Sequence, residues 1–175
     1  MSSNFTVLKD RQIDRLLERL SVAKDPDDVT DVEMEIWSIW ADSGNDAVNM
    51  VFEAATMALR DGEPRLAQTL MNCVVELAPQ FPEGWNRRAT VFILMQNYKA
   101  AMKDLNAALA LEPRHFGALW SRSLVFEAMG DTEDALAELQ RARDINPHID
   151  GLDERLDYLE NGGEPDDWAG DIILG

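Results

Sequence analysis

The 175 residues are 46% hydrophobic and 28% charged, and 33 acidic against 16 basic side chains give a formal net charge of −17. This hydrophobic content excludes disorder of the whole chain and is sufficient for one compact domain or one short solenoid. No run of 18 apolar residues occurs, so no membrane-spanning helix is predicted. The acidic balance argues against nucleic acid or an anionic membrane as the main partner, because both require a basic face.

The acidity is concentrated at the two ends of the chain. Residues 1–47 contain 11 acidic and 5 basic side chains (net −6), and residues 48–149 contain 13 and 10 (net −3). Residues 150–175 contain 9 and 1 (net −8). A basic protein partner would fit these flanks, and so would a purely solubilising role.

Two helices are predicted in residues 1–47. The first covers residues 10–23, where the apolar residues form one stripe: Ile13, Leu16, Leu17 and Leu20. The run Asp25–Asp28, which contains Pro26, ends it. Thr30 and Glu33 have the spacing of a capping box, which predicts a second helix from there through Trp40, ending by Ser43 and Gly44.

A period of 34 residues organises the centre of the chain. Matching positions are Pro79, Pro113 and Pro147, then Ala67, Ala101 and Ala135, and then Met71, Leu105 and Leu139. A fixed period of this length indicates stacked supersecondary units rather than a non-repetitive bundle. Each unit is predicted to be a pair of helices, because its apolar residues recur at spacings of three and four.

The unit at residues 82–115 shows the pattern best. Trp85, Ala89 and Phe92 share one face of a first helix over about 83–96, and Ala101, Leu105 and Ala108 share one face of a second over about 98–111. The alanines allow close helix crossing. Gly62 and Gly130 are placed to end the first helices of the outer units, Pro64 to begin a second helix and Asp131 to cap one.

This pattern resembles the tetratricopeptide repeat (TPR), and the segments WNRRA and LEPRHFGAL are similar to those of small bacterial proteins built from one TPR array. The resemblance implies an all-α, right-handed α-solenoid of helix–turn–helix units. We expect an N-terminal hairpin cap at residues 1–47, followed by three repeats at residues 48–81, 82–115 and 116–149. A capping helix is expected at residues 150–161 and a flexible acidic and apolar tail at residues 162–175.

The N-terminal hairpin is interpreted as a degenerate repeat that caps the array. Glu33 falls where the repeats have Ala67, Ala101 and Ala135, and a charge does not fit that close crossing. Trp37 and Trp40 are predicted to plug the end of the array over Val51 and Ala55 rather than to form a ligand platform. At the other end, Asp150 is expected to cap a helix with three inward leucines: Leu152, Leu156 and Leu159.

The resemblance implies that the first helices line a concave groove that binds a partner. Its predicted contact residues are Phe52, Thr56, Asn86, Arg87, Thr90, Ile93, Trp120 and Leu124. Such a surface suits an extended peptide or an amphipathic helix of another protein. One TPR subclass grips a terminal carboxylate, but Glu53, Glu83 and Gly117 occupy matching places here and contradict that pattern.

The function predicted is therefore a non-enzymatic protein–protein interaction scaffold without metal or other cofactor. An alternative is a self-associating structural module that forms homo-oligomers through its caps or tail. The tail, residues 164–175, could also dock in a groove of its own or a neighbouring chain.

Catalysis is disfavoured because the sequence has no phosphate loop or nucleophile elbow, and His115 and His148 have no second His or Cys at ligand spacing. The lone Cys73 is interpreted as a small buried apolar residue. Without a secretory signal the chain as it stands is expected to be cytoplasmic, and periplasmic if an export signal has been removed.

Overall fold

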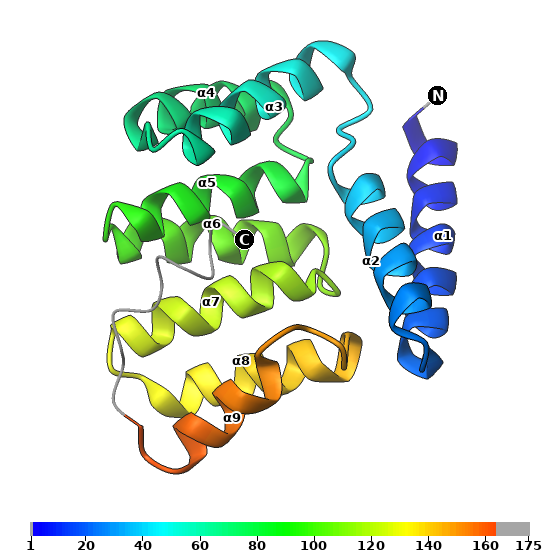
Figure 1. The fold of residues 1–175 in the computed structure, drawn as a ribbon. Coiled ribbons are helices and arrows are strands. Elements are labelled where there is room, and N and C mark those ends of the chain that lie inside the picture. The colour runs from blue at the N-terminus through cyan, green and yellow to red at the C-terminus, as the bar shows by residue number, and fades with distance from the viewer. Residues whose placement is uncertain (1, 164–175) are drawn as a thin grey trace.

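The computed structural model describes residues 2–163, with side chains from Val7 onward. These residues form nine α-helices and no strand, which confirms the all-α repeat solenoid (Figure 1). The helices are α1 (Ser2–Val22), α2 (Pro26–Trp40), α3 (Asp46–Arg60), α4 (Pro64–Leu77), α5 (Pro82–Leu94), α6 (Tyr98–Leu111), α7 (Phe116–Ala128), α8 (Thr132–Ile145) and α9 (Leu152–Glu160).

Helices α3 to α8 form three antiparallel hairpins stacked side by side (Figure 1). Ala67, Ala101 and Ala135 are fully buried, because the crossing within each hairpin leaves room for only a small side chain. Gly62 and Gly130 have φ of +74° and +83° just past the first helices, as predicted. The middle repeat uses Gln96 there, with φ of +57°.

A partly buried arginine clamp recurs in the second and third repeats. The Arg88 guanidinium donates to both carboxylate oxygens of Asp104, at 2.7 and 2.8 Å, and to Asn72 Oδ1 at 3.0 Å. Thirty-four residues later, Arg122 donates to Glu138 Oε2 at 2.8 Å and to Asn106 Oδ1 at 2.9 Å. Each clamp joins the two helices of one repeat to the second helix of the repeat before it.

The N-terminal hairpin lies along the edge of the array where the turns between repeats gather (Figure 1). Arg114, in the turn between α6 and α7, pairs with Asp14 of α1. In the turn after α8, Asn146 Nδ2 donates to Glu33 Oε1 at 2.6 Å, and His148 Nε2 lies 3.1 Å from the Leu20 carbonyl oxygen. The hairpin therefore crosses the ends of the second and third repeats.

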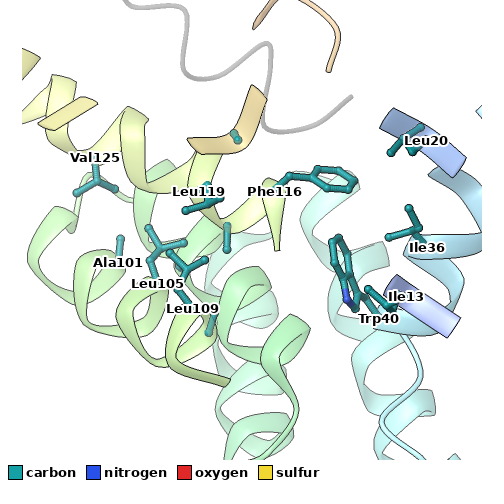
Figure 2. Close-up of a cluster of buried hydrophobic side chains, with 14 of the residues drawn as sticks. Ile13, Leu20, Ile36, Trp40, Ala101, Leu105, Leu109, Phe116, Leu119 and Val125 are labelled. Carbon is teal, nitrogen blue, oxygen red and sulfur yellow. The ribbon is translucent and has the colours of Figure 1, made fainter. Parts of the chain in front are cut away.

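The tryptophans of α2 are not over the first repeat. Trp40 stacks on His115 with ring centroids 4.2 Å apart, and Trp37 packs edge-on against Phe116 at 5.3 Å. Figure 2 shows Ile13, Ile36 and Trp40 facing Phe116 of α7. The predicted plug over Val51 and Ala55 is wrong, because Trp37 instead fills the space left by the missing side chain of Gly117.

Hydrogen bonds in the short connection between α2 and α3 support this placement. Asp42 accepts from Asn49 Nδ2 at 2.9 Å and from the Gly44 N–H at 2.8 Å, while Lys9 Nζ donates to the Asp42 carbonyl oxygen at 2.6 Å. Asn49 Oδ1 in turn accepts from the Ser43 N–H at 2.9 Å. The connection is thereby tied to both α1 and α3.

Three predicted helix caps are corrected. Asp25 caps α2, with Pro26 in the first turn, so the helix starts before the expected capping box; the Thr30 hydroxyl donates to the Pro26 carbonyl oxygen instead. Asp131 occupies the capping position of α8 without a side-chain hydrogen bond. The residue before α9 is Gly151, with φ of +71°, rather than Asp150.

The two ends of the array differ. At the C-terminal end, α9 buries Leu152, Leu156 and Leu159 in a cluster with Ala135 and Leu139 of α8, as predicted. At the N-terminal end, Met50 and Met57 of α3 are 71% and 63% exposed. Cys73 of α4 is also exposed, so its interpretation as a buried residue is wrong. The proposed tail, residues 164–175, lies outside the described residues.

Candidate functional site

The predicted contact residues come from the first helices of the three repeats. Phe52 and Thr56 lie on α3, Trp120 and Leu124 on α7, and Asn86, Arg87, Thr90 and Ile93 on α5. The apolar members belong to three separate buried clusters rather than to one floor. Trp120 and Leu124 share a cluster with the α9 leucines, whereas Phe52 packs against Phe81 with ring centroids 5.3 Å apart.

Six of these eight residues are buried in the structure: Phe52, Asn86, Thr90, Ile93, Trp120 and Leu124. Thr56 and Arg87 remain partly exposed. The Thr56 hydroxyl donates to the Phe52 carbonyl oxygen at 2.9 Å, and the Arg87 side chain is 32% exposed. A partner approaching this face therefore meets polar groups first, and the apolar side chains lie beneath them.

A polar network centred on Glu83 lies at the start of α5. Glu83, 1% exposed, accepts from Arg87 Nε at 2.7 Å, from Asn86 Nδ2 at 2.9 Å and from His115 Nε2 at 2.8 Å. Burial alone would raise the pKa of Glu83, but the positive charge of Arg87 and the hydrogen bonds from His115 and Asn86 lower that pKa to about 2. The carboxylate is thus charged at neutral pH and joins α5 to the turn before α7.

Asn86 has one polar atom without a partner. Its Nδ2 faces the Glu83 carboxylate, which can only accept, so the amide orientation is determined and Oδ1 points away from Glu83. Asn86 Oδ1 is buried and accepts no hydrogen bond. An unsatisfied buried acceptor costs about 1–3 kcal/mol, which a donor from a bound molecule would offset.

His115 is a structural residue that sequence reasoning placed only in a turn. It is fully buried, and its Nδ1 accepts from the Ala118 N–H at 3.2 Å, which caps α7. Nε2 therefore carries the proton that is donated to Glu83. With both nitrogens engaged and one face covered by Trp40, the ring is fixed. Its position directly before the first helix of a repeat was the signal that could have indicated a cap.

The N-terminal hairpin contacts the start of α7. Trp37 of α2 lies so close to Gly117 that a β-carbon there would clash with the indole ring. Gly117 occupies one of the positions with which the terminal-carboxylate subclass of TPR proteins contacts its ligand. At the other end of α7, Glu127 forms an ion pair with Arg155 of α9.

A concavity lies between the hairpin and the array. It has a volume of about 660 Å³ and is lined by α1, the connection before α3 and the turns that precede α5 and α7, with Leu77 of α4 exposed in its wall. Trp40 contributes to the same wall, and its indole Nε1 is buried without a hydrogen-bond partner.

Residues 2–163 contain no group of three or more His, Cys, Asp or Glu side chains that could hold a metal ion. No helix in that range is long and apolar enough to cross a membrane.

The architecture is that of an all-α repeat solenoid, a class that presents its first helices as a binding surface. Comparison with known proteins agrees. A family model described as tetratricopeptide repeat matches residues 82–115. A TPR repeat-containing protein of Rhizobium etli is 32% identical over 149 residues, which cover 85% of this chain and 73% of that protein. The chain belongs to the tetratricopeptide-repeat family.

Solved structures of low identity share the fold. The first TPR domain of Spaghetti (RPAP3), bound to the HSP90 peptide SRMEEVD, has a TM-score of 0.63 at 18% identity, with 65% of this chain and 90% of that one covered. The TPR2B domain of yeast Sti1, in a complex with pHsp70, has a TM-score of 0.62 at 16% identity, with 67% and 98% covered.

Proposed function

We propose that this protein is a non-enzymatic interaction module that binds a peptide or an amphipathic helix of another protein on the concave face of α3, α5 and α7. The observation that carries the proposal is the pair of neighbouring polar residues on α5, where Arg87 is 32% exposed and Asn86 Oδ1 beneath the surface has no hydrogen-bond partner. A backbone N–H of an extended peptide is the kind of donor that this acceptor lacks.

Two further features support this site. Arg87, beside Asn86, is 32% exposed although it pairs with Glu83, so it can contact an acidic or carbonyl group of a ligand. The TPR domains of RPAP3 and Sti1 that share this fold are described as complexes with an HSP90 peptide and with pHsp70, which makes a peptide the natural ligand class to test.

The ligand proposed is not a terminal carboxylate. Glu83 is charged and buried where that subclass needs a cation or an amide, Glu53 is exposed on the same face, and Trp37 covers Gly117. An internal peptide segment or a helix satisfies the geometry without a second anion in the site.

The test is a capture experiment with the immobilised full chain and lysate of the native host, followed by titration of the identified partner with purified protein. The site variant is Arg87→Gln combined with Thr56→Arg; both residues are partly exposed, and glutamine places no second anion beside the buried Glu83. Arg141→Gln is the matched control, because Arg141 also pairs with a carboxylate on its own helix but lies on α8.

We expect the affinity of the site variant for the partner to fall at least tenfold, while its helical circular dichroism is unchanged. The control should bind the partner like the native protein. Equal binding by all three proteins would contradict the proposal and move the search to the 660 Å³ concavity beside the hairpin.

A further inference from the structure

The open end of the array presents a regular stripe of small and large apolar residues. Ala47, Met50, Ala54 and Met57 follow one another on α3 at spacings of three, four and three, and all four are exposed. This alternation places them on one face of the helix and is the spacing of a helix–helix seam.

The inner repeats show which element covers this face elsewhere in the molecule. The residues 34 positions after Met50 and Met57 are Gly84 and Val91 in α5. Another 34 positions further along, the corresponding residues are Ala118 and Val125 in α7. All four are buried. A β-carbon at Gly84 would lie 2.9 Å from a methyl carbon of Val74, so α4 packs directly on this face of α5. The same face of α3 has no helix on it within the described residues, because the hairpin lies along the edge.

We propose that α3 of a second copy of this chain covers the stripe, packed antiparallel about a two-fold axis. Aligning the two seams places Met50 of one copy opposite Ala54 of the other, and Met57 opposite Ala47. Each large side chain then meets a small one in all four layers, as close packing of two helices requires. Antiparallel pairing also aligns the helix dipoles favourably.

The charges that flank the stripe favour this orientation. Asp46, Glu53 and Arg60 follow one another at intervals of seven residues and are exposed. Antiparallel pairing brings Asp46 of one copy to Arg60 of the other, once at each end of the seam. It also brings the two copies of Glu53 together near the axis, where they repel each other.

The expected complex is weak and depends on concentration. A pair of 15-residue helices buries less than the roughly 800 Å² per partner of a standard interface. Each chain also has a net charge of −17, which opposes association at low salt. The apolar stripe on α3 belongs to neither the caps nor the tail. It contains none of the residues that the capture experiment tests, so the proposed dimer goes beyond the proposed function.

Sedimentation equilibrium of the full chain, at physiological salt with a reductant to protect exposed Cys73, tests the proposal. We expect the average mass to rise toward a dimer between micromolar and millimolar protein. Met57→Lys should raise the dissociation constant of the dimer at least tenfold. The control Met34→Lys, at an equally exposed methionine (65%) of α2, should leave it unchanged. Glu53→Gln should strengthen it several-fold, because it removes the repulsion at the axis.

Cysteine cross-linking tests the orientation in a Cys73→Ser background. A mixture of Ala47→Cys and Met57→Cys proteins should form a disulfide-linked dimer. Ala47→Cys alone should not, because its two copies would lie about 15 Å apart along the seam. A mass that stays monomeric at every concentration, a dimer insensitive to Met57→Lys, or efficient cross-linking of Ala47→Cys with itself would each overturn the proposal.

Discussion

The two ends of the repeat array are finished in opposite ways. At the C-terminal end, Leu152, Leu156 and Leu159 of α9 are 1–3% exposed, and Arg155 pairs with Glu127. At the N-terminal end, the helical hairpin that precedes the array leaves Met50 and Met57 in solvent. A helical hairpin next to a repeat in sequence is therefore not necessarily stacked on it.

The difference has a physical cause in the residues that each segment offers. The leucines of α9 recur at spacings of four and three, which fits the surface of α8. In the hairpin, Glu33 stands where a repeat needs alanine, and it binds Asn146 at 2.6 Å instead. The large rings of Trp37 and Trp40 find space over His115, Phe116 and Gly117.

The largest effect expected in this comparison is that of Leu156→Ala in α9. Leu156 is 3% exposed, so its truncation should lower the free energy of unfolding by about 2–4 kcal/mol, through lost burial and the cavity left behind. The control is Leu77→Ala in α4. Because Leu77 is 66% exposed, its truncation should change the free energy of unfolding by less than about 1 kcal/mol. Urea unfolding measures both. Equal losses would contradict the difference between the two ends.

Glu83→Gln tests the junction on which the hairpin rests. The folded pKa of Glu83 is about 2, against an ordinary value of 4.5, so its charged form stabilises the protein above pH 4.5. Near pH 7 the variant should be less stable by about 2 kcal/mol, since Arg87 and His115 lose a charged partner. This deficit should shrink as the pH falls from about 5 toward 2. A deficit that is constant with pH would refute the assigned pKa.

Gly117→Ala should displace the hairpin from the array edge. Alanine normally stabilises a helix relative to glycine by about 1 kcal/mol. Here the added methyl meets the Trp37 ring, so we expect a net loss of about 1–2 kcal/mol and a change in tryptophan fluorescence. Combining it with Trp37→Leu should recover part of the loss. A stabilised single variant would show that Trp37 lies elsewhere.

The smallest effect is expected for Met57→Ala at the open end. Because Met57 is 63% exposed, its truncation should change the free energy of unfolding by less than about 0.5 kcal/mol at low protein concentration. Thermal unfolding of dilute protein measures this. A loss as large as that of Leu156→Ala would mean that a part of the chain already covers α3.

The repeats were predictable from the sequence because their packing is local. The 34-residue period placed the buried alanines and the left-handed Gly62 and Gly130, since each depends only on its own hairpin. The position of the N-terminal hairpin was not predictable, because its contacts with His115 and Asn146 join residues far apart in the sequence.

The candidate site was predictable only in part. The resemblance to TPR proteins pointed to residues on the first helices of the repeats, α3, α5 and α7, but it did not indicate that most of these residues would be buried in separate clusters. The network of Glu83, Asn86 and His115 was missed because it depends on one histidine that caps α7 and reaches back to α5. Each of these residues alone is an ordinary one for a helix start or a turn.

The most direct test of the open N-terminal end is methionine oxidation of the unmodified protein, read residue by residue by mass spectrometry. Oxidation rates follow side-chain exposure. In dilute protein, Met50 and Met57 should oxidise as fast as Met34, while Met71, which is fully buried, should be protected. Protection of Met50 and Met57 at the lowest concentration, to the level of Met71, would contradict the account and place a cap on α3.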